Sequence, residues 1–96
     1  MIVSVCKIMM RLPSRNLKEK RRLLKSLGGR ILNKFSVDVA EVDRNDQSET
    51  AVIGFAVVAN NGHIANRKIE EILDFIEETR MSSQIIDVNR ETMTGF

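Results

Sequence analysis

The stretch AVIGFAVVANNGHIANRKIEEILDFI, residues 51–76, decides the fold class of this 96-residue chain. Residues 51–59 are apolar throughout, which is typical of a central strand that is covered on both faces, or on one face and by a partner. After the polar turn of residues 60–62, apolar residues recur at helical spacing, at Ala65, Ile69, Ile72, Leu73 and Ile76. This apolar stripe ends near Arg80, so the stretch predicts a strand followed by a helix.

Outward from this stretch, the chain predicts three more strands and one more helix. Pro13 ends the alternating pattern at the N-terminus. Asn16 is suited to cap the helix, and Glu19 completes an approximate capping box. The alternation changes phase between residues 40 and 42, which indicates a bulge or a twist in that strand. The expected elements are strands over residues 2–12, 36–43 and 85–88 and a helix over residues 17–34.

The resulting βαββαβ order predicts an α+β fold of the ferredoxin-like, split βαβ type in a single domain over residues 1–96. A four-stranded antiparallel sheet should carry both helices on one face. The other face should then expose an apolar patch too large for a monomer, so we expect a homodimer. The residues predicted for this dimer face are Val3, Val5, Met9 and Phe55.

Three sequence blocks carry a resemblance to a known family. Residues 16–22 (NLKEKRR), 37–47 (VDVAEVDRNDQ) and 53–60 (IGFAVVAN) resemble the uncharacterised bacterial family typified by the YlxP-like proteins. The resemblance covers nearly the whole chain and implies a small ferredoxin-like domain whose gene often lies among those of translation factors. The family's activity is unsettled, so the resemblance implies a fold and a cellular neighbourhood more than a reaction.

The chain departs from this family at two places. Gly28 and Gly29 interrupt a helix that is usually poor in glycine, so they could break it or let it lie close to the sheet. The hairpin NDQSETA, residues 45–51, lacks the aromatic residue that is often found soon after the Asp-Gln pair.

The charges are sorted along the chain. Residues 1–35 hold ten Lys and Arg and one acid, whereas residues 36–96 hold five and twelve, within a formal net charge of +2. Helical spacing places a group of cations on one side of the first helix, and structured or ribosomal RNA is a partner that such a strip suits, because cations near phosphates release condensed counterions. The candidate nucleic-acid-binding residues are Arg11, Arg15, Lys18, Arg21, Arg22 and Lys25.

A second interpretation of the basic strip stays open. Arg30 and Lys34 lie on the opposite flank of the first helix, and the second helix is rich in acids that could neutralise the first. These acids are Glu70, Glu71, Asp74, Glu77 and Glu78. The strip is therefore predicted to be either an RNA contact or a solvated helix face. Base-specific RNA recognition is disfavoured, because the chain has no Trp or Tyr.

We expect no enzymatic activity, no cofactor and no metal. His63, the only histidine, should be a surface residue in a first helical turn, and Cys6, the only cysteine, should pack in the core. The acids near the hairpin match no EF-hand spacing. They are Glu41, Asp43, Asp46 and Glu49.

Two further functions stay open as alternatives, a protein-interaction adaptor and an ACT-like module that senses a ligand. The single cysteine and the lack of an 18-residue apolar window favour a cytoplasmic protein that neither spans a membrane nor is secreted.

Overall fold

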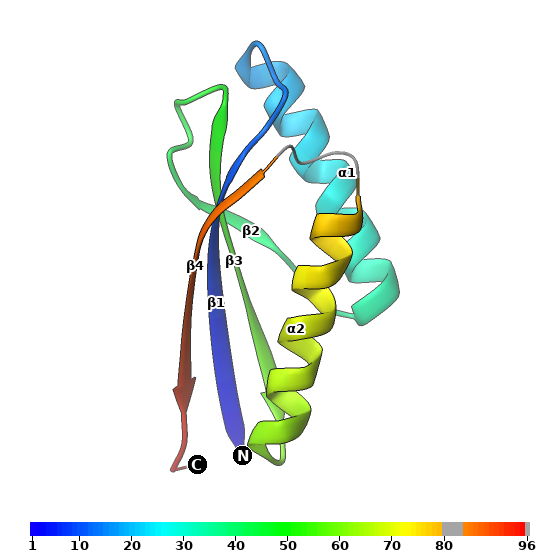
Figure 1. The fold of residues 1–96 in the computed structure, drawn as a ribbon, viewed down its shortest axis with the longest axis vertical. Helices are drawn as coiled ribbons and strands as arrows, with labels where there is room; N and C mark the ends of the chain where they lie inside the picture. The colour runs from blue at the N-terminus through cyan, green and yellow to red at the C-terminus, as the bar shows by residue number, and fades with distance from the viewer. Residues whose placement is uncertain (80–83, 96) are drawn as a thin grey trace.

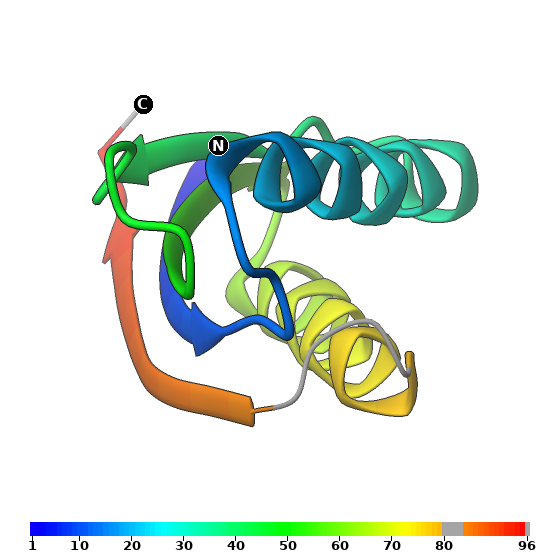
Figure 2. The same cartoon turned by 90° about the horizontal axis from the view of Figure 1, so that it is seen from above.

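Six elements follow one another in the predicted βαββαβ order in the computed structural model, which describes residues 1–79 and 84–95. Their bounds are β1 Ile2–Arg11, α1 Leu17–Phe35, β2 Ala40–Asp43, β3 Thr50–Ala59, α2 Gly62–Glu78 and β4 Gln84–Met93. The predicted α+β class and single layer of helices are confirmed, since both helices lie on one side of the sheet (Figures 1 and 2).

The sheet has the strand order β2-β3-β1-β4, and every neighbouring pair is antiparallel. Both crossovers, through α1 and α2, skip one strand, which is the split βαβ arrangement of ferredoxin-like folds. In the centre of the sheet Cys6 lies opposite Phe55 on one side and Arg90 on the other. The bulge expected in β2 is present, because its register with β3 shifts between Glu41 and Asp43.

Both helices begin at an asparagine cap. The side chain of Asn16 accepts a hydrogen bond of 2.9 Å from the backbone N–H of Glu19, and Asn61 accepts one of 3.0 Å from that of Ile64. The capping box is therefore formed in part, and the Asn60-Asn61-Gly62 turn serves to start α2. At the other end of α1, Ser36 adopts a left-handed conformation with φ of 57°, which directs the chain away from the helix.

The core lies between the helices and one face of the sheet. Alternation along β1 turns Cys6, Ile8 and Met10 toward the helices, where Leu27 and Ile31 of α1 are also buried. Each such side chain contributes about 1.5–3 kcal/mol through removal from water. The remaining buried members are Leu12, Val37, Ala51, Ile53, Phe55, Val57, Ala65, Ile69, Ile72 and Ile76.

The assignment of Phe55 to the dimer face is wrong. Phe55 is only 6 % exposed and belongs to the core cluster. The reason is register: Phe55 lies opposite Cys6, and directly paired residues share a face of the sheet. An entirely apolar strand such as residues 51–59 gives no alternation from which its inward face can be chosen.

The bounds of β2 and β4 differ most from those predicted. β2 begins at Ala40 rather than residue 36, because residues 36–39 connect α1 to the sheet, although Val37 still packs in the core. β4 extends to Met93, well beyond residue 88. Its second half is polar and so carries no apolar alternation. α2 ends at Glu78, and Arg80, near which the sequence predicts its end, lies outside the described residues.

The glycine pair neither breaks α1 nor brings it close to another element. The helix is continuous through Gly28 and Gly29, and a Cβ added at either position would meet nothing within 4 Å. We therefore predict that Gly28→Ala and Gly29→Ala each raise the free energy of unfolding by about 1 kcal/mol, the difference in helix propensity. Urea unfolding followed by circular dichroism measures this.

The neighbouring Leu27 supplies a control of opposite sign. Its side chain is buried, so Leu27→Ala should lower the free energy of unfolding by about 2–5 kcal/mol. A loss of stability in either glycine variant would contradict the open surroundings of these two positions.

Candidate nucleic-acid interface

The orientation of α1 about its own axis decides which cations face the solvent. Lys20, Leu27 and Ile31 are its buried residues, so their side of the helix packs on the sheet. Four exposed cations occupy the outward side at the spacing i, i+3, i+4 and i+7, which spans about 10 Å along a helix. We call these four the basic surface: Lys18, Arg21, Arg22 and Lys25.

The ammonium group of Lys20 is buried, and three oxygen atoms surround it. Its Nζ lies 2.7 Å from Oε2 of Glu41, and it donates hydrogen bonds of 2.7 Å to the carbonyl of Arg44 and 2.6 Å to that of Gln47. Only 1 % of the Lys20 side chain is exposed. A buried ammonium is tolerated when oxygen atoms replace its hydration and a carboxylate balances its charge, and here two hydrogen bonds and one ion pair do so. We call this arrangement the Lys20 clamp.

The Lys20 clamp joins α1 to the loop between β2 and β3. Two further hydrogen bonds join the same loop to the segment that precedes α1, from the backbone N–H of Leu12 to the carbonyl of Glu49 and from Oγ of Ser14 to the carbonyl of Ser48. These contacts place the β2–β3 loop beside the N-terminal end of α1. The loop therefore helps to fix the position of the first turns of α1.

The acids of α2 form no ion pair with the basic surface within the described residues. Within the described part of the chain, none of its four cations forms an ion pair. Glu70 instead pairs with Arg90 of β4. The first turns of α1 extend past the C-terminal end of α2, so the acids of α2 lie beside later turns of α1 (Figure 1). There Lys34 lies 4.9 Å from the ring centre of Phe75.

The other two candidate cations differ in their position relative to the basic surface. Arg15 precedes α1, and its side chain is 91 % exposed with Nε 3.7 Å from the carboxylate of Glu19. Arg11 is the last residue of β1 and is exposed, but strand alternation places it on the sheet face opposite the helices. Arg15 therefore extends the basic surface at the entry to α1, and Arg11 does not.

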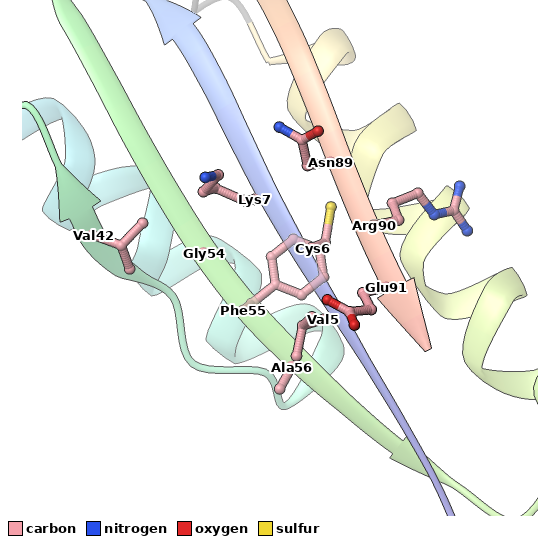
Figure 3. A pocket seen from close by; sticks show the side chains of 10 residues that line it. All are labelled: Val5, Cys6, Lys7, Val42, Gly54, Phe55, Ala56, Asn89, Arg90 and Glu91. Carbon is pink, nitrogen blue, oxygen red and sulfur yellow. The ribbon is translucent and has the colours of Figure 1, made fainter. Parts of the chain in front are cut away.

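The sheet face opposite the helices forms a second surface, which we call the open face. Here β1 contributes the predicted dimer residues Val3, Val5 and Met9, all partly exposed. A hollow of about 740 Å³ lies at its centre, over Gly54 and Ala56 (Figure 3). Figure 3 shows the helices behind the sheet and places Val42, Lys7, Asn89 and Glu91 around this hollow.

Groups suited to catalysis are isolated from one another. Burial raises the pKa of the Cys6 thiol, an effect that the charge of Arg90 partly offsets and that of Glu70 reinforces. His63 is exposed in the first turn of α2, as predicted.

In residues 1–79 and 84–95, no three His, Cys, Asp or Glu side chains group as a metal site. Among the same residues, no helix is long and apolar enough to span a membrane.

Lys20 has a structural role that its place in a basic run does not indicate. Lys20 stands among other cations in a basic run, so its charge by itself predicts an exposed side chain. A positional signal was present, because Lys20 lies seven residues before Leu27 and eleven before Ile31, on the same side of a helix. Position on the apolar stripe therefore separates Lys20 from the cations that flank it.

Comparisons with known proteins give a family match and a similar bacterial protein. Residues 3–90 match the family described as "Protein of unknown function (DUF503)". The chain is 32 % identical to the uncharacterized protein YlxP of Bacillus subtilis (strain 168) over 62 residues, 65 % of this chain and 67 % of that protein.

Two designed proteins are similar in structure. Foldit4 matches with a TM-score of 0.55 and 20 % identity over 99 % of this chain and 98 % of its own. LFR1 1, described as having a ferredoxin fold, matches with a TM-score of 0.48 and 15 % identity over 99 % and 87 %. The likeness to Foldit4 concerns the fold alone.

We predict that Lys20→Met lowers the free energy of unfolding by about 3 kcal/mol, because it leaves the Glu41 carboxylate and two carbonyl groups without their cation. Urea unfolding measures the change. Hydrogen exchange should also become faster at the Gln47 amide in the joined loop. Lys18→Met, on the exposed side of the same helix, is the matched control and should change stability by less than about 0.5 kcal/mol. Equal effects of the two substitutions would contradict the clamp.

We predict that the Cys6 thiol of the folded protein reacts with a disulfide reagent roughly 100-fold or more slowly than the thiol of the urea-unfolded chain, because reaction requires opening of the core. Raising the pH from 7 to 8.5 should accelerate the folded protein at least as much as the unfolded one, because a thiol with a raised pKa stays far from full ionisation over this range, whereas the ionisation of an exposed thiol begins to level off. Similar rates for the folded and unfolded protein would show that Cys6 is accessible.

Proposed function

Because the chain belongs to the DUF503 family, whose function is unknown, we propose a function from its own surface: it binds structured RNA, through phosphates, at the basic surface of α1. The protein acts in this proposal as a non-catalytic cytoplasmic binding domain. Ribosomal RNA is the expected partner, given the translation-related neighbourhood that the YlxP-like resemblance implies.

One observation carries the proposal. The four cations of the basic surface are exposed on one side of α1 and form no ion pair within the described residues. Unpaired cations at this spacing can approach successive phosphates, and each contact releases condensed counterions. The described residues make no ion pair between α2 and the basic surface, so the competing interpretation that the titration has to exclude is a solvated helix face.

The aromatic residues support recognition of the RNA backbone rather than its bases. All four aromatic residues of the chain are Phe. Phe55 is buried, and the rings of Phe35 and Phe75 pack edge to face with centres 5.6 Å apart. Single-stranded RNA is usually read by stacking bases on accessible aromatic rings, so a double-stranded or otherwise structured RNA fits this surface better.

A binding titration tests the proposal, with ribosomal RNA and a mixed-sequence RNA duplex at about 50 and 200 mM salt. With about four phosphate contacts, this rise in salt concentration should weaken binding roughly 50- to 150-fold. The triple variant Arg21→Glu, Arg22→Glu and Lys25→Glu should lose this salt-sensitive binding while its circular dichroism spectrum stays unchanged, since all three side chains are exposed.

A matched triple variant controls for net charge. Arg30→Glu, Arg67→Glu and Lys68→Glu change the formal charge equally but lie outside the basic surface. This variant should retain most of the binding. Equal loss in both triple variants would show a response to net charge alone, and undiminished binding in the first would exclude the basic surface as the site.

A further inference from the structure

We propose that the open face of the sheet binds a second copy of this chain, with Lys7 of each copy facing Glu91 of the other. This surface lies on the side of the sheet opposite the helices, so the proposal does not depend on RNA binding by α1 (Figure 2). It defines which of the chain's surfaces forms a dimer and which charges determine its geometry.

Charge complementarity is the first argument for a second copy. Lys7 is exposed in the centre of the open face, opposite Gly54 on β3 and Asn89 on β4. Glu91 lies on the same face, two residues beyond Asn89. Within the described residues, neither Lys7 nor Glu91 forms an ion pair. In an interface with twofold symmetry every contact occurs twice. If Lys7 of one copy pairs with Glu91 of the other, then Glu91 of the first copy also pairs with Lys7 of the second.

Shape is the second argument. Gly54 and Ala56 leave the hollow of about 740 Å³ at the centre of the face. Val58, four residues beyond Gly54 on the same strand and the same face, is 65 % exposed, so an apolar side chain stands out beside the hollow. The face therefore holds both a hollow and an apolar projection, as a self-complementary interface requires.

The hollow has a structural cause in Gly54. Gly54 has no side chain to fill the face at this point, and a Cβ added there would lie 3.3 Å from Cγ1 of Val42, so the bulged strand β2 approaches Gly54 closely. Val42 is itself 52 % exposed, and it borders the hollow on the side of β2 (Figure 3). Thus the bulge in β2 and the glycine in β3 shape the hollow together.

The size of the open face agrees with this occupant. Three strands of ten residues and one of four give a sheet of roughly 500 Å² in plane. Stable interfaces bury about 800 Å² of accessible surface per partner. Accessible surface follows the outlines of the projecting side chains, so it is larger than the in-plane area of the same face. A second copy with an identical face can cover this area entirely, including the exposed apolar side chains Val42, Val58 and Met93.

Sedimentation equilibrium at about 1 to 200 µM protein tests the proposal in the absence of RNA. The parent chain should form dimers. Lys7→Glu and Glu91→Lys should each weaken dimerisation about tenfold or more, because each places like charges at the paired positions. The double variant that carries both substitutions restores opposite charges and should dimerise within about threefold of the parent.

Two further variants keep the result interpretable. Arg67→Glu, a charge reversal on the exposed side of α2, should dimerise as the parent does. Val58→Lys should reduce dimerisation even when Lys7 and Glu91 are both unchanged. Val58 is exposed, so this substitution should leave the fold intact.

Three results would overturn the proposal. One is a parent chain that stays monomeric throughout the concentration range, which would leave the open face to a different partner. Another is a dimer that survives all single reversals and Val58→Lys, as expected for pairing along the edge of β4. The third is a double variant that remains as weak as the single variants.

Discussion

The buried ammonium group of Lys20 is the interaction on which the arrangement of this molecule depends. A cation removed from water is tolerated only when oxygen atoms replace its hydration, and here a carboxylate from β2 and two carbonyls from the β2–β3 loop do so. The interaction fixes the first turns of α1 against the edge of the sheet. It also turns one side of the helix inward, so that the neighbouring cations face outward.

This constraint explains how one basic segment serves two purposes. Lys20 satisfies a structural requirement inside the protein, whereas Lys18 and Arg21, two residues before it and one after it, are exposed. The difference in burial arises from the 3.6-residue period of the helix and not from the type of residue, since Lys18 and Lys20 are both lysines. Exposed cations without acidic partners keep their hydration and their capacity to release counterions from a phosphate backbone.

The two faces of the sheet have contrasting surroundings. Helices cover one face, and its side chains form the core, including Cys6 and Phe55. The opposite face combines apolar side chains with Lys7 and Glu91, which form no ion pair in the described part of the chain. Charges in an apolar surface tend to specify geometry and partner more than affinity. A homodimer and an RNA contact could therefore coexist, because they use opposite sides of one small domain.

Local signals in the sequence determined the order of the elements, the N-cap of α1 and the bulge of β2, because alternation, helical spacing and an asparagine cap act within a few residues. The tertiary structure alone decided the inward face of β3, the length of β4 and the oxygen partners of Lys20. Phe55 faces the core because it pairs with Cys6, and the polar end of β4 is a strand because β1 supplies its hydrogen bonds. Each of these depends on residues far apart in the chain, whose pairing a local pattern does not encode.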